Sequence, residues 1–516
     1  MNFDAIRYYK PIAKQDNAIV VDADLCIYGG SSAGIAAAIQ ASRMGVKVVI
    51  AEFGTHLGGL TTGGLGATDI GNKAAIGGIS REFYVALGKH YGTTEGDGTQ
   101  WTFEPSVAKE IYMTWLEKAG IIVHLDQQLV KAIKKDGRIQ EIHMSNGNIF
   151  KAGMFIDATY EGDLLAAADV SYHVGRESNN TYQEVLNGIH FGDREHDFKA
   201  WVDPYRIAGK PDSGLLHGVS EAPLGIQGQG DASVQAYNFR ICLTNDPANR
   251  AAFPAPPNYD PEEFTLQARY INAGIWDTML LHKMMPNNKT DLNNKGAVST
   301  DYIGQNHRWP EGSYEEREEM FQAHFRNNLG MLYFLSNDER LPQFVRDEMS
   351  QWGLPKDEYL DSGMWTPQLY IREGRRMISD IVMTEHYCRK FKTVEDSIGL
   401  AAYTMDSHNC RRVVLDGRVV NEGNVEVAPS GPYPISYRSI VPKGEECTNL
   451  LVPICLSASH IAFGSIRMEP VFMILGQSAA TAAVMALAEG KAIQDISYAK
   501  LRSRLLQDQQ VLEWRD

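Results

Sequence analysis

The pattern of apolar and polar positions is most regular near the N-terminus, where two apolar runs flank a segment with helical spacing. Residues 25–28 and 47–51 are short apolar runs of the kind that form buried parallel strands. Between them, residues 35–44 carry apolar positions at helical spacing, and Gly45 ends the segment. The order strand, helix, strand predicts a βαβ unit over residues 24–52.

The turn between the first strand and the helix, residues 29–34, has the sequence GGSSAG. It matches the dinucleotide fingerprint G-x-G-x-x-G except at Ser31, which stands in place of the second glycine. In that fingerprint Gly29 allows the tight turn, Gly34 lets the helix pack on the strand, and a pyrophosphate lies at the helix N-terminus. Ser31 either crowds the phosphate with its Cβ or donates its hydroxyl to it. We expect a bound dinucleotide; the alternative is a Gly-rich turn without a ligand.

The residues that follow distinguish FAD from NAD. Glu52 has the position of the carboxylate that accepts from the ribose hydroxyls, which disfavours a 2′-phosphate. Residues 53–66 form a second Gly-rich loop, similar to the loop that runs along the pyrophosphate toward the flavin in FAD proteins of the glutathione reductase type. The two cysteines that disulfide reductases place beyond this loop are absent, so we expect neither dithiol chemistry nor, without a second fingerprint, a separate NAD(P)H domain. His56 has two possible roles: it carries a covalently attached flavin, or, more simply, it is a loop side chain beside the pyrophosphate.

The rest of the N-terminal part extends this domain. Helices are expected at 79–91, 105–118 and 164–168, and strands at 121–125, 128–133 and 154–157. The turn dipeptides Asp136-Gly137 and Asn146-Gly147 predict a three-stranded β-meander, the usual crossover of such FAD domains. Residues 1–20 are expected to form a loose arm.

From about residue 176 the character of the chain changes, because prolines cluster and polar loops alternate with amphipathic helices. We expect helices at 261–285, 314–336 and 471–488, strands at 237–244 and 449–455, and a hairpin at 412–427. The predicted fold class is α/β: a Rossmann-like FAD/NAD(P)-binding domain of glutathione reductase type with a β-meander, plus an inserted α+β substrate or cap domain. The predicted parts are 18–175 and 396–495 for the FAD-binding domain, 176–395 for the cap and 496–516 for a C-terminal helix.

Composition narrows the possible partners and the compartment. The chain has 516 residues and a formal net charge of −15, which disfavours nucleic acid and anionic membranes as partners. Its six cysteines show no C-x-x-C pair, so no disulfide framework and no metal site is expected. No run of transmembrane length and no signal peptide is apparent, which favours the cytoplasm, or the periplasm if a signal was removed. The oligomeric state stays open.

Six blocks carry a resemblance to a known family. They are YEGD at 160–163, GRES at 175–178, YNFR at 237–240, IREGRR at 371–376, MDSH at 405–408, and residues 449–483, which include SASHIAFGSIRMEP. Over residues 24–488 the chain resembles bacterial FAD-dependent oxidoreductases that are often labelled xanthan lyase. The resemblance implies a glutathione-reductase-type fold, bound FAD and an oxidoreductase, and it leaves the substrate open.

The residues expected to contact FAD come from the fingerprint turn, the second Gly-rich loop, the meander, the strand end near 158 and the start of the late small-residue helix. They are Gly29, Gly30, Ser31, Ser32, Ala33, Gly34, Glu52, Phe53, His56, Leu57, Gly58, Gly59, Thr62, Gly63, Val130, Ala158, Asp163, Ser465, Met468 and Glu469.

Two histidines are candidate catalytic bases. A flavin enzyme that oxidises a small polar substrate, such as the CH–OH of a carbohydrate or polyol, takes a hydride at N5 while a base removes a proton. His460 follows an apolar strand, and His408 follows Asp406 by two residues. For each, the alternative is a structural histidine that holds a loop. Arg372 could hold a polar or anionic substrate, with Arg375 and Arg376 more typical of a salt-bridged face. Residues 293–295 could line a sugar pocket. The alternative function is a flavoprotein isomerase or lyase without net redox turnover.

Overall fold

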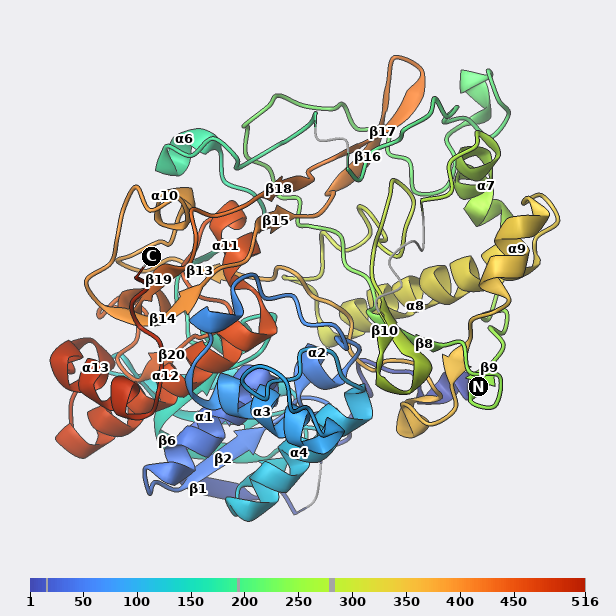
Figure 1. Ribbon diagram of the computed structural model, residues 1–516. Helices are drawn as coiled ribbons and strands as arrows, with labels where there is room; N and C mark the ends of the chain where they lie inside the picture. The colour runs from blue at the N-terminus through green and yellow to red at the C-terminus, as the bar shows by residue number, and fades with distance from the viewer. Residues whose placement is uncertain (15–16, 193–194, 278–283, 516) are drawn as a thin grey trace.

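Seven strands form the central sheet of the nucleotide-binding part (Figure 1). The computed structural model describes residues 1–14, 17–192, 195–277 and 284–515. The strand order is β3-β2-β1-β6-β5-β4, and β20 pairs with β6 on a branch from this path. The strands are β1 (Val20–Tyr28), β2 (Val48–Ala51), β3 (Ile122–His124), β4 (Leu129–Lys135), β5 (Arg138–Met144), β6 (Ile149–Asp157) and β20 (Leu450–Leu451).

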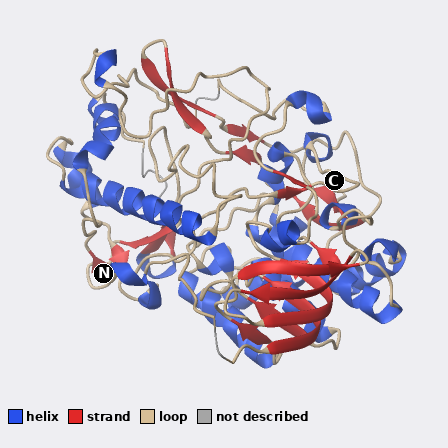
Figure 2. Ribbon diagram, turned by 180° about the vertical axis from the view of Figure 1, so that it is seen from behind, coloured by secondary structure: helices blue, strands red, loops and turns tan. Residues whose placement is uncertain are grey.

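The predicted β-meander shares its last strand with the parallel part of this sheet. β6 pairs in parallel with β1 from Ile149 to Asp157, while its first residues also pair antiparallel with β5. The predicted strand at 154–157 and the third meander strand are therefore one strand. Consequently β4 and β5 extend the same sheet, which Figure 2 shows from behind.

Helices α1 (Ser32–Arg43) and α12 (Glu469–Glu489) pack closely against each other beside the sheet. A Cβ on Gly476 of α12 would lie 2.2 Å from the carbonyl oxygen of Ala33, so only glycine fits where the two helices meet. α12 has 21 residues and a mean hydropathy of 1.8, which is long and apolar enough to cross a membrane, although we expected no such run. Because 83% of this apolar stretch of α12 is buried inside the protein, the helix fills the core of the domain.

The other helices of this part are α2 (Gly59–Thr62), α3 (Gly78–Tyr91), α4 (Pro105–Lys118), α5 (Asp163–Ala167) and α13 (Tyr498–Gln507). α3 and α4 confirm the predicted helices there. The predicted C-terminal helix at 496–516 is shorter, because α13 ends at Gln507.

A second hydrophobic core surrounds the long helix α8 (Tyr314–Asn337), which lies apart from the central sheet in Figure 1. Ser313 caps this helix in a capping box with Glu316, as its predicted start requires. Its inner face packs Phe325 against Trp365. The neighbouring elements are α7 (Thr265–Asn272), α9 (Gln343–Met349), β8 (Ile241–Thr244), β9 (Arg250–Ala251), β10 (Met284–Met285), β11 (Lys289–Leu292) and β12 (Leu354–Pro355). The short helix α6 (Asn179–Tyr182) lies away from this core in Figure 1.

The remaining strands form short antiparallel pairs. They are β7 (Tyr172–His173) with β13 (Arg376–Met377), β14 (Ser397–Ala401) with β19 (Tyr433–Ser436), β15 (Met405–Ser407) with β18 (Val425–Val427), and β16 (Arg411–Leu415) with β17 (Arg418–Glu422). Two further short helices, α10 (Glu385–Cys388) and α11 (His460–Ile466), lie among them. The predicted hairpin at 412–427 is thus β16–β17 alone, because its last residues form β18.

Three other predictions are wrong in extent. The predicted helix at 261–285 ends at Asn272, because Gly274 takes a φ of 91° that a helix cannot continue through; residues 278–283 lie outside the described residues. The predicted strand at 237–244 begins only at Ile241. The predicted strand at 449–455 is reduced to β20, two residues long.

The first part of the predicted loose arm, residues 1–9, is packed against the protein, whereas most of the described residues from 10 to 20 are exposed; residues 15–16 lie outside the described residues. Ile6 and Tyr8 are buried in the second core, and the Tyr8 hydroxyl donates to Glu161 at 2.7 Å. The backbone N–H groups of Tyr8 and Tyr9 donate to Glu318 on α8 at 2.9 and 2.8 Å. Polar composition suggested an arm, but the anchoring partners of Tyr8, Glu161 and Glu318, lie 153 and 310 residues away in the sequence.

Candidate functional site

The fingerprint turn has the close packing that its glycines predict. Gly29 has a φ of 104°, and a Cβ there would lie 2.7 Å from the backbone of Ala158. A Cβ on Gly34 would lie 2.1 Å from the carbonyl oxygen of Gly29. Both positions therefore require glycine, and the backbone of the turn stays open to a ligand at the first turn of α1.

Ser31 is used by the turn itself. Its hydroxyl donates to the carbonyl oxygen of Ala158 at 2.7 Å and accepts from the N–H of Gly34 at 3.3 Å as the N-cap of α1. The serine in place of the second glycine thus ties the turn to the strand end at Ala158.

Glu52 closes the adjacent crevice. Its carboxylate accepts from the N–H groups of Gly30 at 2.5 Å and Gly54 at 2.9 Å. Burial raises the pKa of Glu52 to about 7, against the lowering effect of these two donors. The crevice brings together many of the predicted contacts: Gly29, Gly30, Ser31, Glu52, Phe53, His56, Gly59 and Ala158.

The second Gly-rich loop packs against the same crevice. His56 lies with Nε2 3.1 Å from the carbonyl oxygen of Gly59 and 2.9 Å from the Thr62 hydroxyl. Burial lowers its pKa to about 4, so the imidazole is neutral at physiological pH. A Cβ on Gly59 would lie 2.2 Å from the hydroxyl of Tyr160, so the loop needs glycine there too.

The start of α12 meets the start of α1 at a buried carboxylate. Glu469, the first residue of α12, accepts hydrogen bonds from Ser32 and from Thr61 at 2.8 Å and Tyr160 at 2.7 Å. Met468 is the N-cap of α12 and is buried. Through Ser32 of the fingerprint turn, this junction brings the predicted contacts Met468 and Glu469 next to that turn.

Other predicted cofactor contacts have different surroundings. Val130 lies on β4 with 62% of its surface exposed. The Asp163 carboxylate is held by Arg317 at 2.8 Å and Arg375 at 2.9 Å. The Ser465 hydroxyl donates to the carbonyl oxygen of Tyr403 at 2.5 Å. Their roles toward a cofactor remain predictions.

A polar cavity of about 200 Å³ lies between β15 and the inserted part. Its wall contains Asp69, His196, Asn293, Asn294, Lys295, Tyr370, Tyr403, Thr404, Asp406, His408 and Glu426. The predicted sugar-binding residues 293–295 and His408 therefore share one cavity. No group of three metal-ligating side chains occurs among the residues that the structure describes.

His408 on this wall is held by two carboxylates, Asp406 on the same wall and Asp301 behind it. Its Nδ1 lies 2.7 Å from Asp301 and its Nε2 3.3 Å from Asp406. Burial opposes ionisation of Asp301, but Arg372 and His408 hold the pKa of that carboxyl below its usual value. Arg372 is fully buried, lies 2.8 Å from Asp301 and stacks on Tyr370, so it contacts His408 through Asp301.

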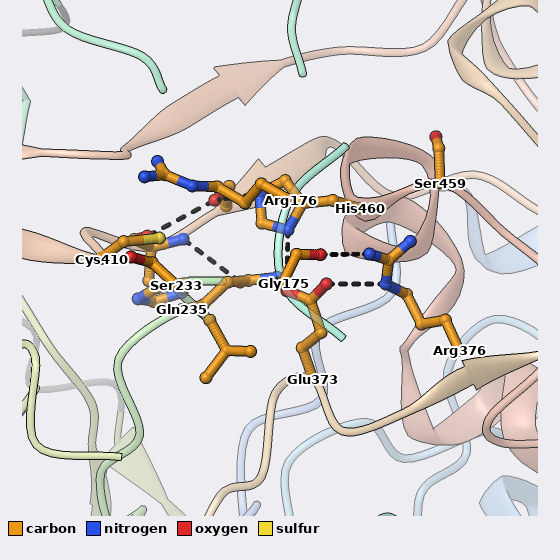
Figure 3. A network of polar contacts seen from close by, with 12 residues as sticks. Gly175, Arg176, Ser233, Gln235, Glu373, Arg376, Cys410, Ser459 and His460 are labelled. Atoms are coloured by element: carbon orange, nitrogen blue, oxygen red, sulfur yellow. Dashed lines mark hydrogen bonds and ion pairs between the residues drawn. The ribbon is translucent and has the colours of Figure 1, made fainter. Parts of the chain in front are cut away.

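His460, the other predicted base, lies in a sealed network (Figure 3). Its Nδ1 lies 2.7 Å from Glu373 and its Nε2 2.9 Å from the Ser407 hydroxyl. Glu373 lies 2.8 Å from Arg376, which also pairs with Glu177 at 2.6 Å. Glu373, Arg376 and His460 are at most 1% exposed, and His460 is absent from the wall of the polar cavity.

Sequence reasoning missed most of the cavity wall. Asp69, His196, Tyr370, Tyr403 and Glu426 come from separate segments and carry no common motif, and neither does Asp301, which holds His408 from behind the wall. Asp406 did have a signal, because residues two apart on a strand share a face, and it stands two before His408.

The central sheet, the glycine turn and the carboxylate at the second strand end define a Rossmann-type dinucleotide-binding protein. Residues 24–505 match the sequence profile of the FAD dependent oxidoreductase family, so the chain belongs to that family. Membership of this family indicates FAD as the cofactor, and the cradle of Gly29, Gly34 and Glu52 fits it.

Solved structures show distant likeness. A 3-ketosteroid-delta4-(5alpha)-dehydrogenase from Rhodococcus jostii RHA1 is 15% identical over 30% of this chain and 49% of its own, with a TM-score of 0.20. The L-proline dehydrogenase from P. horikoshii is 13% identical over 31% and 59%, with a TM-score of 0.25. The T. acidophilum thioredoxin reductase is 20% identical over 26% and 34%, with a TM-score of 0.17.

Each of these matches spans less than two thirds of the solved chain. No curated protein matches this sequence. The family assignment therefore rests on the sequence match over residues 24–505.

Proposed function

We propose that this protein oxidises a CH–OH group of a small, neutral, polar substrate, of the kind found in carbohydrates and polyols, inside the polar cavity. The observation that carries the proposal is His408, which lies on the cavity wall with Nδ1 2.7 Å from Asp301. When bound, FAD supplies the acceptor for the hydride that leaves the substrate carbon. His408 takes the proton that leaves the substrate hydroxyl.

The pairing of His408 supports its role as the base. Asp301 accepts from Nδ1–H, which fixes the ring and leaves the lone pair of Nε2 for a substrate proton. Asp406, 3.3 Å from Nε2, then faces the new N–H and stabilises the imidazolium. Arg372 stabilises this arrangement from behind by its ion pair with Asp301 at 2.8 Å.

The charges around the cavity favour a neutral substrate. In the described part of the chain, each Lys or Arg that lines or supports the cavity already has a carboxylate partner. The pairs are Lys295 with Glu195 at 2.5 Å, Arg240 with Asp69 at 2.6 Å, Arg372 with Asp301 at 2.8 Å and Arg467 with Asp406 at 2.9 Å. An anionic substrate would have to displace one of them, whereas substrate hydroxyls can donate to the lining carboxylates.

Tyr370 supplies a donor to the substrate. Arg467 donates to its phenolic oxygen at 2.7 Å, and a guanidinium cannot accept, so the phenol proton points away from Arg467. Because Tyr370 lines the cavity, we assign this O–H to a substrate oxygen.

The cavity is linked to the cofactor end of the molecule. Arg467 holds Asp406 and stands two residues before Glu469 at the start of α12. A Cβ on Gly464 of α11 would lie 2.3 Å from the carbonyl oxygen of Asp406, so α11 packs directly on β15. These contacts support a substrate site beside the flavin end of the cofactor.

The visible spectrum of the purified holoprotein tests the proposal. We would record it anaerobically before and after adding a panel of sugars and polyols. One of them is expected to bleach the flavin absorbance, and His408→Gln is expected to slow that bleaching while His90→Gln, an exposed histidine on α3, leaves it unchanged.

A flavin spectrum that no sugar or polyol bleaches would overturn the proposal. Product formation without bleaching would support the non-redox alternative, an isomerase or lyase.

A further inference from the structure

Glu469 is a buried acid with three hydroxyl donors. It is 2% exposed at the first position of α12. Its Oε2 accepts from Ser32 and from Thr61 at 2.8 Å, and its Oε1 accepts from Tyr160 at 2.7 Å. The donors belong to α1, to α2 and to the segment after β6, so three elements converge on this carboxyl.

No cation balances this carboxyl among the residues that the structure describes. The titratable groups that face it are Tyr84 on α3, Tyr112 on α4 and Tyr160, and none is basic. Burial raises the pKa of Glu469, although the three hydroxyls favour the charged form. The positive N-terminal end of α12 also favours the charged form.

We propose that Glu469 is a neutral acid in the FAD-bound protein and that the cofactor enters together with one proton at this residue. Ser32 is the first residue of α1, in the fingerprint turn that holds the pyrophosphate of FAD. The pyrophosphate brings negative charge to a buried carboxylate that has no counter-cation, and in a low-dielectric site that repulsion is strong. The inference rests on FAD as cofactor and not on the substrate proposed above.

The hydroxyls around Glu469 can accommodate the proton. A serine or threonine hydroxyl both donates and accepts, so it can turn to accept from a protonated Glu469. Ser32 in that orientation has its own proton free for a phosphate oxygen. Protonation of Glu469 therefore lets the Ser32 hydroxyl, which donates to the carboxylate, donate to the cofactor instead.

The sign of the pH dependence follows from the proton uptake. If FAD binds with a proton at Glu469, its release should become faster as pH rises through the pKa of that acid in the holoprotein, and level off above it. One linked proton gives a change of at most about tenfold per pH unit. Glu52 acts in the opposite direction, because its pKa of about 7 means that a carboxylate required by the ribose must lose a proton on binding.

The test compares FAD release from holoproteins across mildly acidic to alkaline pH, followed by the fluorescence of free FAD. Glu469→Gln keeps a neutral side chain of the same shape, so we expect its release to lose the acceleration at alkaline pH and to fall below the wild-type rate there. Glu489→Gln, at the opposite end of α12 and paired with Lys491 and Lys500, serves as matched control with wild-type behaviour.

Infrared difference spectroscopy of the holoproteins gives an independent readout. The wild-type protein should show a carbonyl band of a protonated carboxylic acid that Glu469→Gln lacks and Glu489→Gln retains. An unchanged pH dependence together with an unchanged band in Glu469→Gln would overturn the proposal.

A second variant keeps the test decisive if Glu469→Gln does not retain FAD. Thr61→Val withdraws one donor from the carboxylate and leaves the acid in place. Because that donor favours the charged form, its loss should keep Glu469 neutral to higher pH and shift the onset of faster FAD release upward. An onset at the wild-type pH would contradict the proposal.

Discussion

Two histidines lie near strand β15, and each has a carboxylate beside its Nδ1. His408 Nδ1 lies 2.7 Å from Asp301, and His460 Nδ1 lies 2.7 Å from Glu373. At the other ring nitrogen, His408 has Asp406 at 3.3 Å and His460 has the Ser407 hydroxyl at 2.9 Å. By these distances alone, either imidazole is oriented as a base.

Their surroundings separate them. His408 lines the polar cavity beside Asn293, Lys295 and Tyr370. His460 lies in the sealed network with Glu373, where Arg376 ties it to Glu177. A carboxylate on Nδ1 therefore identifies an oriented histidine, and only access to a cavity distinguishes a base from a structural one.

The largest expected effect is on the rate of flavin reduction. His408→Gln should slow the reductive half-reaction by about 10²–10⁴-fold, because the proton acceptor is lost. The measurement is anaerobic stopped-flow reduction of the holoprotein with the sugar or polyol that bleaches it. FAD content should stay at the wild-type level.

The matched variant is His460→Gln. It should lower the folding stability and leave the pH profile of flavin reduction as in the wild type. Reduction slowed more in His460→Gln than in His408→Gln would reverse our assignment and make the sealed histidine the base.

The next effect is on folding stability, where the sealed network of His460 should matter more than the cavity wall of His408. Glu373→Gln leaves Arg376 and His460 with one less buried negative charge, so we expect the free energy of unfolding to fall by about 3–5 kcal/mol. Glu426→Gln breaks only the pair with His196 at the more exposed cavity wall, where about 0.2–1 kcal/mol is expected. Denaturant unfolding measures both, and equal losses would show that the network is no more stabilising than the cavity wall.

The nucleotide-binding part was predictable because its signals are local. The apolar runs, the helical spacing and the glycine turn at 29–34 lie within thirty residues, and each position has a direct physical requirement. Even so, the shared strand β6 was read as two elements, because its pairing with β1 cannot be seen from either segment alone.

The cavity was only partly predictable because its partners are distant. Asp301 lies 107 residues from His408 in the sequence, and Tyr370 reaches the wall by a bridge with Asn238. No periodicity links such segments. Both histidines were found from residue type and neighbours, yet nothing local indicated which one would face the cavity.

Acid sensitivity should come from the sealed network. Burial opposes ionisation of Glu177, but Arg376 lowers the pKa of its carboxyl to about 2, well below the unfolded value near 4.3. A depressed pKa gives stability that is present above the unfolded value and is lost as pH falls toward 2. Thermal unfolding between about pH 5 and 2 should therefore show a smaller acid-induced loss in Glu177→Gln than in the wild type. An identical loss would place the acid-sensitive group elsewhere.

A small effect is expected at Ser407, whose hydroxyl lies 2.9 Å from His460 Nε2. With Glu373 this completes the order Ser, His, acid that nucleophilic hydrolases use. Ser407 is 0% exposed, so we interpret the three residues as a buried hydrogen-bond chain that keeps β15 in place. Ser407→Ala should lower the free energy of unfolding by about 0.5–1.5 kcal/mol and leave flavin reduction at the wild-type rate. A serine-directed fluorophosphonate should not label the wild-type protein, and labelling that Ser407→Ala abolishes would show that the network opens and holds a nucleophile.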